Sequence, residues 1–94
     1  MNIVVEFTGG GRAMTGTREV TLNLPDSVTY RDVVRRLAQI YPGLVGAIIA
    51  PDGNSLLSAM FFDRNGEESI LPAMMDQSPR DGDRLILMFF IVGG

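Results

Sequence analysis

The 94-residue sequence contains no cysteine and no histidine. Without cysteine the chain cannot form a disulfide, use a thiol nucleophile or build a thiolate metal site. Without histidine it lacks the commonest general base at neutral pH and the commonest ligand of transition metals. These absences argue against a hydrolase or a transition-metal enzyme. We therefore expect a protein that is not itself an enzyme and that binds no cofactor.

Lysine is absent as well, since all eight basic residues are arginine. A preference for arginine codons is the simpler explanation. A functional explanation is protection, because ε-amines attack adenylates and thioesters, whereas the guanidinium group, with a pKa above about 12, does not. A protein that carries an activated acyl group benefits from having no amines of its own. The sequence leaves both explanations open.

Long apolar runs are also missing. The longest, residues 85–92 and 44–50, fall far short of the roughly 20 residues that a membrane span needs, so we expect no membrane association. The start Met1-Asn2-Ile3 shows no signal-peptide pattern, which makes the cytoplasm the expected location. The length and the 46% hydrophobic content predict one folded domain over residues 1–94.

The charge balance disfavours nucleic acid as a partner. The net charge is -3 and the pI is about 4.7, whereas phosphate binding needs a clustered basic surface. Arg31, Arg35 and Arg36 form the one basic cluster along the sequence. Since they fall on the polar side of a predicted helix, we interpret them as a solvated helix face.

The first half of the chain predicts a β-hairpin followed by a helix. Residues 2–8 and 17–24 alternate apolar and polar side chains, and the glycine-rich residues 9–16 between them predict a mobile loop. That loop lacks the context of a phosphate-binding loop. Residues 29–41 have helical periodicity, with a Thr29–Asp32 capping box. The first strand is expected to bury Ile3, Val5 and Phe7.

The second half predicts further strands. Residues 59–63 and 68–71 flank Asn65-Gly66, which is a strong hairpin signal, and the last strand runs from Arg84 to about Ile91. Residues 80–83 (RDGD) predict a tight turn, in which Asp81 and Asp83 are better explained as turn formers than as metal ligands. Apart from a turn at Pro51-Asp52-Gly53-Asn54, no structure is assigned to residues 44–57 or to the connection at 72–80.

The remaining reactive group is the C-terminal carboxylate, because the chain ends in Gly93-Gly94 after its most apolar strand. At a glycine frequency of ~7%, this ending occurs by chance in about one chain in two hundred. An enzyme that activates a carboxylate must draw it through a narrow channel, which glycine fits because it has no side chain. A frayed terminus of no special function is the alternative.

The element order, a hairpin, a helix and then strands with the most apolar one last, is that of an α+β, ubiquitin-like β-grasp. Its mixed sheet of four to five strands carries one main helix on one face. Together with Asn65-Gly66, Asp81-Gly82-Asp83 and the terminal Gly93-Gly94, this order resembles the MoaD/ThiS group of ubiquitin-like sulfur carriers over essentially the whole chain. Molybdopterin-type members often carry Pro-Pro where this chain has Phe89-Phe90, which weakens that particular assignment.

The resemblance implies a function for the flexible tail at about residues 92–94. Gly94 is expected to be adenylated by a ubiquitin-activating-like enzyme that uses ATP, and then converted to a thiocarboxylate, while Gly93 gives it reach. Sulfur would pass to molybdopterin, to thiamine thiazole or to tRNA, with a sulfur acceptor or a synthase large subunit as a further partner. The alternatives are a protein modifier conjugated through Gly94 to amines, and an interaction module without tail chemistry.

The parity of the last strand predicts where a partner docks. Eight consecutive apolar residues cannot all meet one helix, because alternate side chains point to opposite faces. Leu85, Leu87 and Phe89 are expected under the helix. An apolar patch on the open face is then expected to bind the activating enzyme or, weakly, a second copy. The residues of this predicted docking face are Val4, Ile86, Met88 and Phe90.

Overall fold

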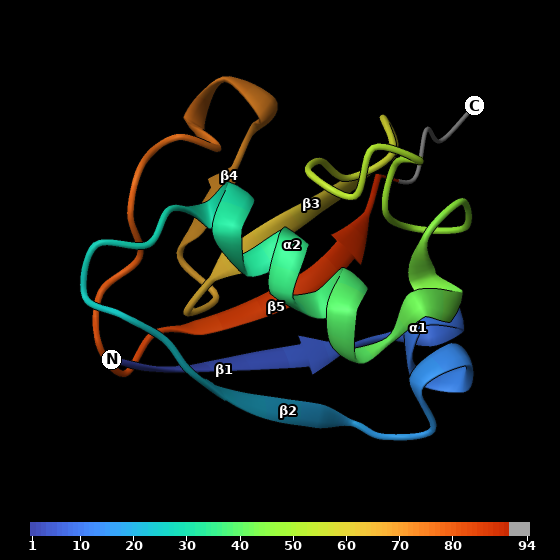
Figure 1. Ribbon diagram of the computed structural model, residues 1–94, viewed down its shortest axis with the longest axis horizontal. Coiled ribbons are helices and arrows are strands. Elements are labelled where there is room, and N and C mark those ends of the chain that lie inside the picture. The colour runs from blue at the N-terminus through green and yellow to red at the C-terminus, as the bar shows by residue number, and fades with distance from the viewer. Residues whose placement is uncertain (91–94) are drawn as a thin grey trace.

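The computed structural model describes residues 1–90, which form a five-stranded mixed sheet with one long helix across one face (Figure 1). The strands lie in the order β2-β1-β5-β3-β4, with β5 parallel to β1 and antiparallel to β3. The predicted fold class, with the last strand beside the first in the centre of the sheet, is confirmed. The elements are β1 (Asn2–Phe7), α1 (Gly9–Thr15), β2 (Glu19–Asn23), α2 (Tyr30–Ile40), β3 (Met60–Arg64), β4 (Glu68–Ile70), β5 (Arg84–Phe89) and the short 3-10 helices η1 (Pro42–Leu44) and η2 (Pro72–Met74).

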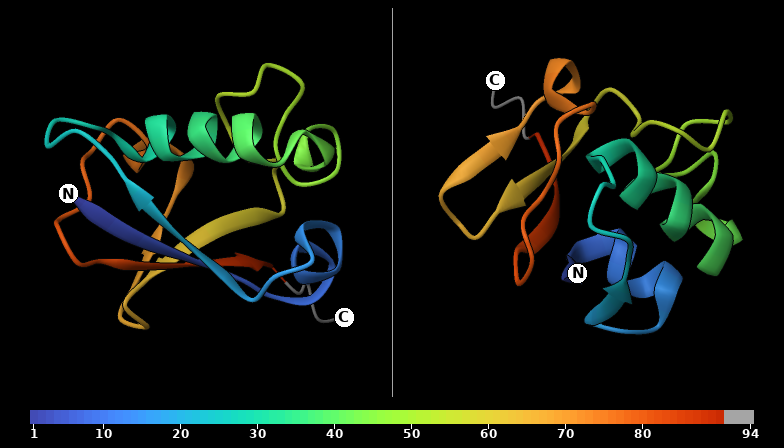
Figure 2. Two further views of the ribbon diagram at one scale, coloured as in Figure 1. Left: turned by 60° about the horizontal axis from the view of Figure 1, so that its bottom comes forward. Right: turned by 60° about the vertical axis from the view of Figure 1, so that its left-hand side comes forward.

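Helix α2 covers one side of the sheet, and the core lies between them (Figure 2, left). The predicted capping box is present, because the Thr29 side chain accepts a hydrogen bond from the Asp32 N–H and the Asp32 carboxylate accepts one from the Thr29 N–H. The predicted core residues of β1 are fully buried. The buried side chains between the sheet and α2 include Ile3, Val5, Phe7, Leu22, Val33, Val34, Leu37, Phe62, Ile70, Leu85 and Leu87.

The Asn65-Gly66 turn joins β3 to β4 as predicted. Both residues have positive φ, 57° and 74°, as the central positions of a primed turn require, and the Glu67 N–H donates to the Arg64 carbonyl at 2.9 Å. Arg64 is aligned with Glu68, so the loop between the paired positions has three residues, 65–67. The last strand ends at Phe89, earlier than the expected Ile91, and residue 91 itself lies outside the described residues.

The prediction of a mobile loop at residues 9–16 is wrong, because residues 9–15 form α1. Three glycines disfavour a helix by about 1 kcal/mol each relative to alanine. Packing offsets that cost, since Gly11 is buried so closely against Ile48 and Phe7 that a Cβ there would lie 3.4 Å from the Ile48 Cδ1. Gly16 ends the helix in the left-handed conformation, with φ of 71°.

The two segments without a prediction pack as irregular chain. Residues 42–57 contain η1 and a series of turns, and they add Leu44, Ile48 and Ile49 to the core. Residues 72–80 contain η2 and bury Met75. Among residues 1–90, no helix is long and apolar enough to cross a membrane.

Candidate functional site

The sheet face opposite α2 carries an apolar patch on its central strands. Val4, Ile86 and Met88 are half-buried there, on alternate positions of β1 and β5. Phe61 of β3 is aligned with Met88, and its ring stacks on Phe90 with the centroids 4.4 Å apart. The structure thus places the four residues of the predicted docking face on one side of the sheet and adds Phe61. We call these five residues the open-face patch.

Phe89 does not pack under the helix as expected. Leu85 and Leu87 are buried at 0% and 1% exposure, but Phe89 is 49% exposed. An 11-residue helix is about 16 Å long, and Phe89 is aligned with Met60 at the end of the sheet, where neither side chain is fully buried. The Phe89 ring lies beside Gly9, where a Cβ would be 3.6 Å from its Cε1.

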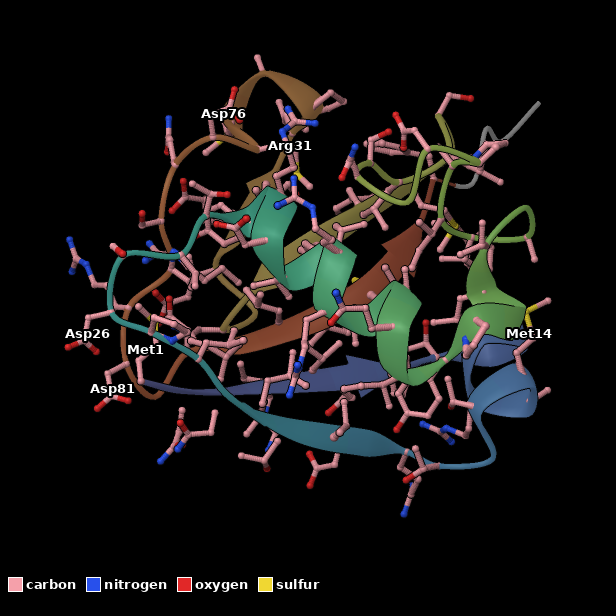
Figure 3. All side chains as sticks on the ribbon, viewed as in Figure 1. Met1, Met14, Asp26, Arg31, Asp76 and Asp81 are labelled. Carbon is pink, nitrogen blue, oxygen red and sulfur yellow. The ribbon has the colours of Figure 1, made fainter. Side chains whose placement is uncertain are left out.

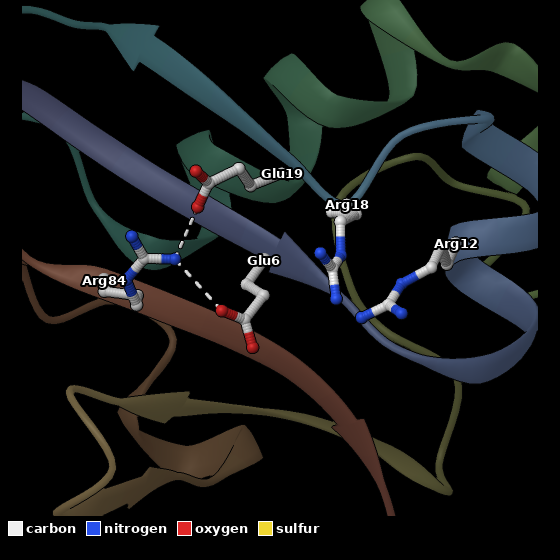
Figure 4. A pocket seen from close by; sticks show the side chains of 5 residues that line it. All are labelled: Glu6, Arg12, Arg18, Glu19 and Arg84. Atoms are coloured by element: carbon white, nitrogen blue, oxygen red, sulfur yellow. Dashed lines mark hydrogen bonds and ion pairs between the residues drawn. The ribbon is translucent and has the colours of Figure 1, made fainter.

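A polar pocket of about 440 Å³ adjoins the patch on the same face (Figure 4). At its centre, the Arg84 guanidinium donates to the Glu6 carboxylate at 3.0 Å and to the Glu19 carboxylate. The hydrogen bond and charge of Glu19, followed by those of Glu6, raise the pKa of Arg84 further above its ordinary value. Glu6 is aligned with Ile86 across β1 and β5, so the pocket and the patch are continuous.

Arg12 of α1 and Arg18, which precedes β2, form the other wall of this pocket (Figure 4). Both side chains are exposed, and among residues 1–90 neither makes an ion pair. Sequence reasoning missed this basic group because its members come from three separate elements. The register of β1 with β2 and β5 gives a signal for Glu6, Glu19 and Arg84, which share one face, but it does not place Arg18, which precedes β2.

The arginine cluster that the sequence analysis identified is instead largely neutralised. Arg31 pairs with Asp76 at 2.9 Å, and Arg35 pairs with Asp32 at 3.0 Å. Figure 3 labels Arg31 and Asp76, which lie close together. Arg36 is exposed. Their place on the outer surface of α2 agrees with a solvated helix face.

The acidic turn before β5 is structural. The Asp83 carboxylate, 6% exposed as a residue, accepts hydrogen bonds from the Arg80 N–H and the Asn65 side chain, and Asp81 accepts one from the Asn2 N–H. The bond from Arg80 confirms Asp83 as a turn former, and Asp81 ties the turn to the start of β1. Residues 1–90 contain no group of three or more acidic, histidine or cysteine side chains arranged to hold a metal ion.

A smaller pocket of about 190 Å³ lies on the helix side, lined mainly by apolar side chains of Leu56, Met60, Ile70 and Met75 with Arg31 at its rim. The open-face patch lies instead on the other side of the sheet, along β5, and reaches the end of the sheet where β5 leaves it. Because β5 is parallel to β1, this is also the end where α1 follows β1. Gly93 and Gly94, the predicted reactive tail, lie outside the described residues.

Solved structures provide the comparison. The small archaeal modifier protein SAMP1 from Haloferax volcanii superposes with a TM-score of 0.81 at 22% identity, with both chains covered completely. A further Haloferax volcanii protein has a TM-score of 0.78 at 28% identity, over 100% of this chain and 87% of its own. A putative molybdopterin converting factor subunit 1 from Pyrococcus furiosus has a TM-score of 0.74 at 14% identity, over 96% and 98% of the two chains.

The chain has the ubiquitin-like β-grasp fold. No protein-family model matches this β-grasp chain, and no curated protein matches it. The similarity to the Pyrococcus furiosus structure confirms the resemblance to the MoaD/ThiS group at the level of the fold. The open-face patch and the arginine-lined pocket are the surface features that a function of this β-grasp protein has to explain.

Proposed function

We propose that this β-grasp protein is a sulfur carrier of the cytoplasm. Its Gly94 carboxylate is adenylated by a ubiquitin-activating-like enzyme and converted to a thiocarboxylate. The carboxylate oxygen attacks the α-phosphate of ATP, and pyrophosphate leaves. Sulfide, or a sulfur donor that acts as its equivalent, then attacks the acyl carbon, so that a C–S bond forms and AMP departs with the oxygen. No oxidant or reductant is needed when sulfide is the nucleophile.

The observation that carries this proposal is the open-face patch beside the end of β5. A single sheet face with four half-buried apolar residues and the exposed Phe90, whose ring stacks on Phe61, is unusual for a surface that meets only water. It lies on the strand that leads, within five residues of Phe89, to Gly94. A partner that covers the patch is therefore placed to receive the tail.

The similar structures support two versions of this role. The Pyrococcus furiosus protein is described as a molybdopterin converting factor subunit, in line with sulfur transfer. SAMP1 from Haloferax volcanii and SAMP1 from Methanosarcina acetivorans are described as small archaeal modifier proteins, which favours a second candidate, conjugation of Gly94 to target amines. Both versions share the adenylation step, and in neither is the chain itself the catalyst.

Intact-mass spectrometry tests the proposal. The protein is incubated with ATP, sulfide and an adenylating enzyme of the ubiquitin-activating type from the same genome. Replacement of one oxygen by sulfur at the C-terminus is expected, and it should require both ATP and Gly94. An unchanged mass for the native chain, under conditions where the enzyme activates another carrier, contradicts the proposal. A product joined to an added amine, formed faster than the thiocarboxylate, favours the modifier version.

A further inference from the structure

The arginine-lined pocket beside the open-face patch has an unbalanced charge. Three arginines face two glutamates, which leaves one net positive charge on a chain whose total is -3. Arg84 already bonds both glutamates, so the excess resides on Arg12 and Arg18. This part of the surface therefore attracts anions, although the molecule as a whole repels them.

We infer that Arg12 and Arg18 bind acidic side chains on the protein that covers the open-face patch. This inference rests on the proposed function, because the protein that we assign to this site is the adenylating enzyme. The partner surface has a stated chemistry: an apolar group that packs on Ile86 and Met88, flanked on one side by carboxylates that pair with the two guanidiniums.

Charge complementarity together with continuity of the surface favours this occupant. Glu6 lines the pocket and is aligned with Ile86 of the patch, so a chain lying on the patch reaches the pocket without a gap. The planar guanidinium donates in a fork that matches a carboxylate. Because Glu6 and Glu19 hold Arg84 in place, the two remaining arginines are free to turn toward a ligand.

A free anion is the weaker alternative. Both arginines are exposed, and exposed ion pairs in water contribute little by themselves. The same pairs strengthen when a partner covers the neighbouring patch and excludes water. The pocket should therefore select an anion that is part of an apolar surface, and its charges should mainly accelerate association and make it dependent on salt.

The position of the pocket links it to the tail. Arg12 follows the end of β1 in α1 and Arg18 directly precedes β2, and β5 runs parallel to β1 and ends at the same end of the sheet. A partner held by these arginines is thus anchored on the side of the patch opposite β3. With the patch as the second contact, its orientation relative to the end of β5 is fixed.

The test uses a short capped peptide in which glutamate and leucine alternate. Its binding is followed by NMR from the Arg12 and Arg18 side-chain N–H signals and the Met88 methyl signal. The double variant R12E/R18E is expected to bind it about tenfold more weakly and to prefer the same peptide with lysine in place of glutamate. The control R36E/R80E makes the same change in net charge at exposed arginines outside the pocket and should bind normally.

Three results overturn the inference. Equal weakening by the control variant means that net charge alone acts. Tighter binding of inorganic phosphate or ATP than of the peptide means that the pocket is a site for free anions. Shifts at the arginines without a shift at Met88 mean that the two surfaces are not used together. If R12E/R18E melts early, the neutral variant R12Q/R18Q takes its place, with a smaller expected loss.

Two further measurements separate this inference from the proposed function. A chain without Gly93 and Gly94 should still bind the peptide, although it cannot be adenylated. In steady-state adenylation, R12E/R18E should raise KM for the carrier about tenfold with an unchanged kcat and a flatter dependence on salt. Normal peptide binding by a native chain that is never adenylated refutes the proposed function and leaves the peptide-binding site in place. Normal adenylation kinetics for R12E/R18E refute the inference alone.

Discussion

Phe90 and Leu87 lie three residues apart, and replacing each by alanine should have opposite consequences. Leu87 is 1% exposed in the core under α2, so Leu87→Ala removes buried methyl groups and leaves a cavity. The expected loss in the free energy of unfolding is about 2–5 kcal/mol. Phe90 is 45% exposed and contacts the Phe61 ring, so Phe90→Ala loses mainly an aromatic stack, about 0.5–1.5 kcal/mol.

Binding should show the reverse order. An aromatic anchor at the centre of an interface typically contributes about 2 kcal/mol or more, so Phe90→Ala should weaken binding to the adenylating enzyme at least tenfold. Leu87→Ala, measured at a temperature where it remains folded, should bind almost normally. Denaturant unfolding gives the stability of each variant, and titration calorimetry or surface plasmon resonance gives the affinity.

Phe89→Ala is the matched control, because Phe89 is the same residue type with 49% exposure but belongs to the other face. It should have little effect on binding. Equal losses of affinity in Phe89→Ala and Phe90→Ala would refute the open-face assignment. A loss of stability in Phe90→Ala as large as that in Leu87→Ala would refute the burial argument itself.

Three further predictions concern the tail, the missing lysines and the helix cap. Deletion of Gly94, or addition of one residue after it, should abolish adenylation without changing the melting temperature; normal loading of the extended chain in the mass assay would contradict the carrier function. Arg12→Lys should let the activated tail be captured by an internal amine, seen as loss of water in the mass spectrum, and its absence would favour codon bias. The hydrogen bond from the Thr29 N–H lowers the pKa of Asp32 below its ordinary value of 3.8, with smaller help from the Thr29 hydroxyl and Arg35. Its stabilisation is complete above pH 3.8 and is lost as the pH falls through the folded-state pKa, so thermal melts of Asp32→Asn should lack this part of the acid dependence, and an unchanged acid profile would show that the cap contributes nothing.

The strands and α2 were predictable because their side chains repeat with the period of the element. Ile3, Val5 and Phe7 alternate in β1, and Thr29 and Asp32 mark the start of α2. The turn at Asn65-Gly66 was predictable because few residue types accept a positive φ, and asparagine and glycine are the main ones. These signals are local, so the sequence contains them in full.

Helix α1 and the position of Phe89 were not predictable in the same way. Gly9, Gly10 and Gly11 disfavour a helix locally, and the helix forms because it packs against a segment more than thirty residues away. Phe89 continues the alternation of β5, but whether a helix reaches it depends on where α2 ends above the sheet. Both outcomes depend on tertiary contacts that no sequence period records.

The candidate site shows the same division. Val4, Ile86, Met88 and Phe90 follow from strand parity, whereas Phe61 joins them only through the register of β3 with β5. Arg12 lines the same pocket as Arg18 only because of the course of α1, which the sequence pattern did not show. A correct element order therefore gives the apolar half of the site and misses its charged half.

The central position of β5 determines how the domain responds to mechanical force. Its backbone is hydrogen-bonded along both sides, to β1 over residues 84–87 and to β3 over residues 85–89. Tension applied to the chain beyond Phe89 pulls along the strand and loads both ladders in shear, so many bonds must break at once. The outer hairpin of β3 and β4 can instead open one bond at a time from its end. An enzyme that pulls the tail into its channel consequently moves the whole domain toward itself, and a protease-linked unfolding motor that starts from this end meets the most resistant strand first.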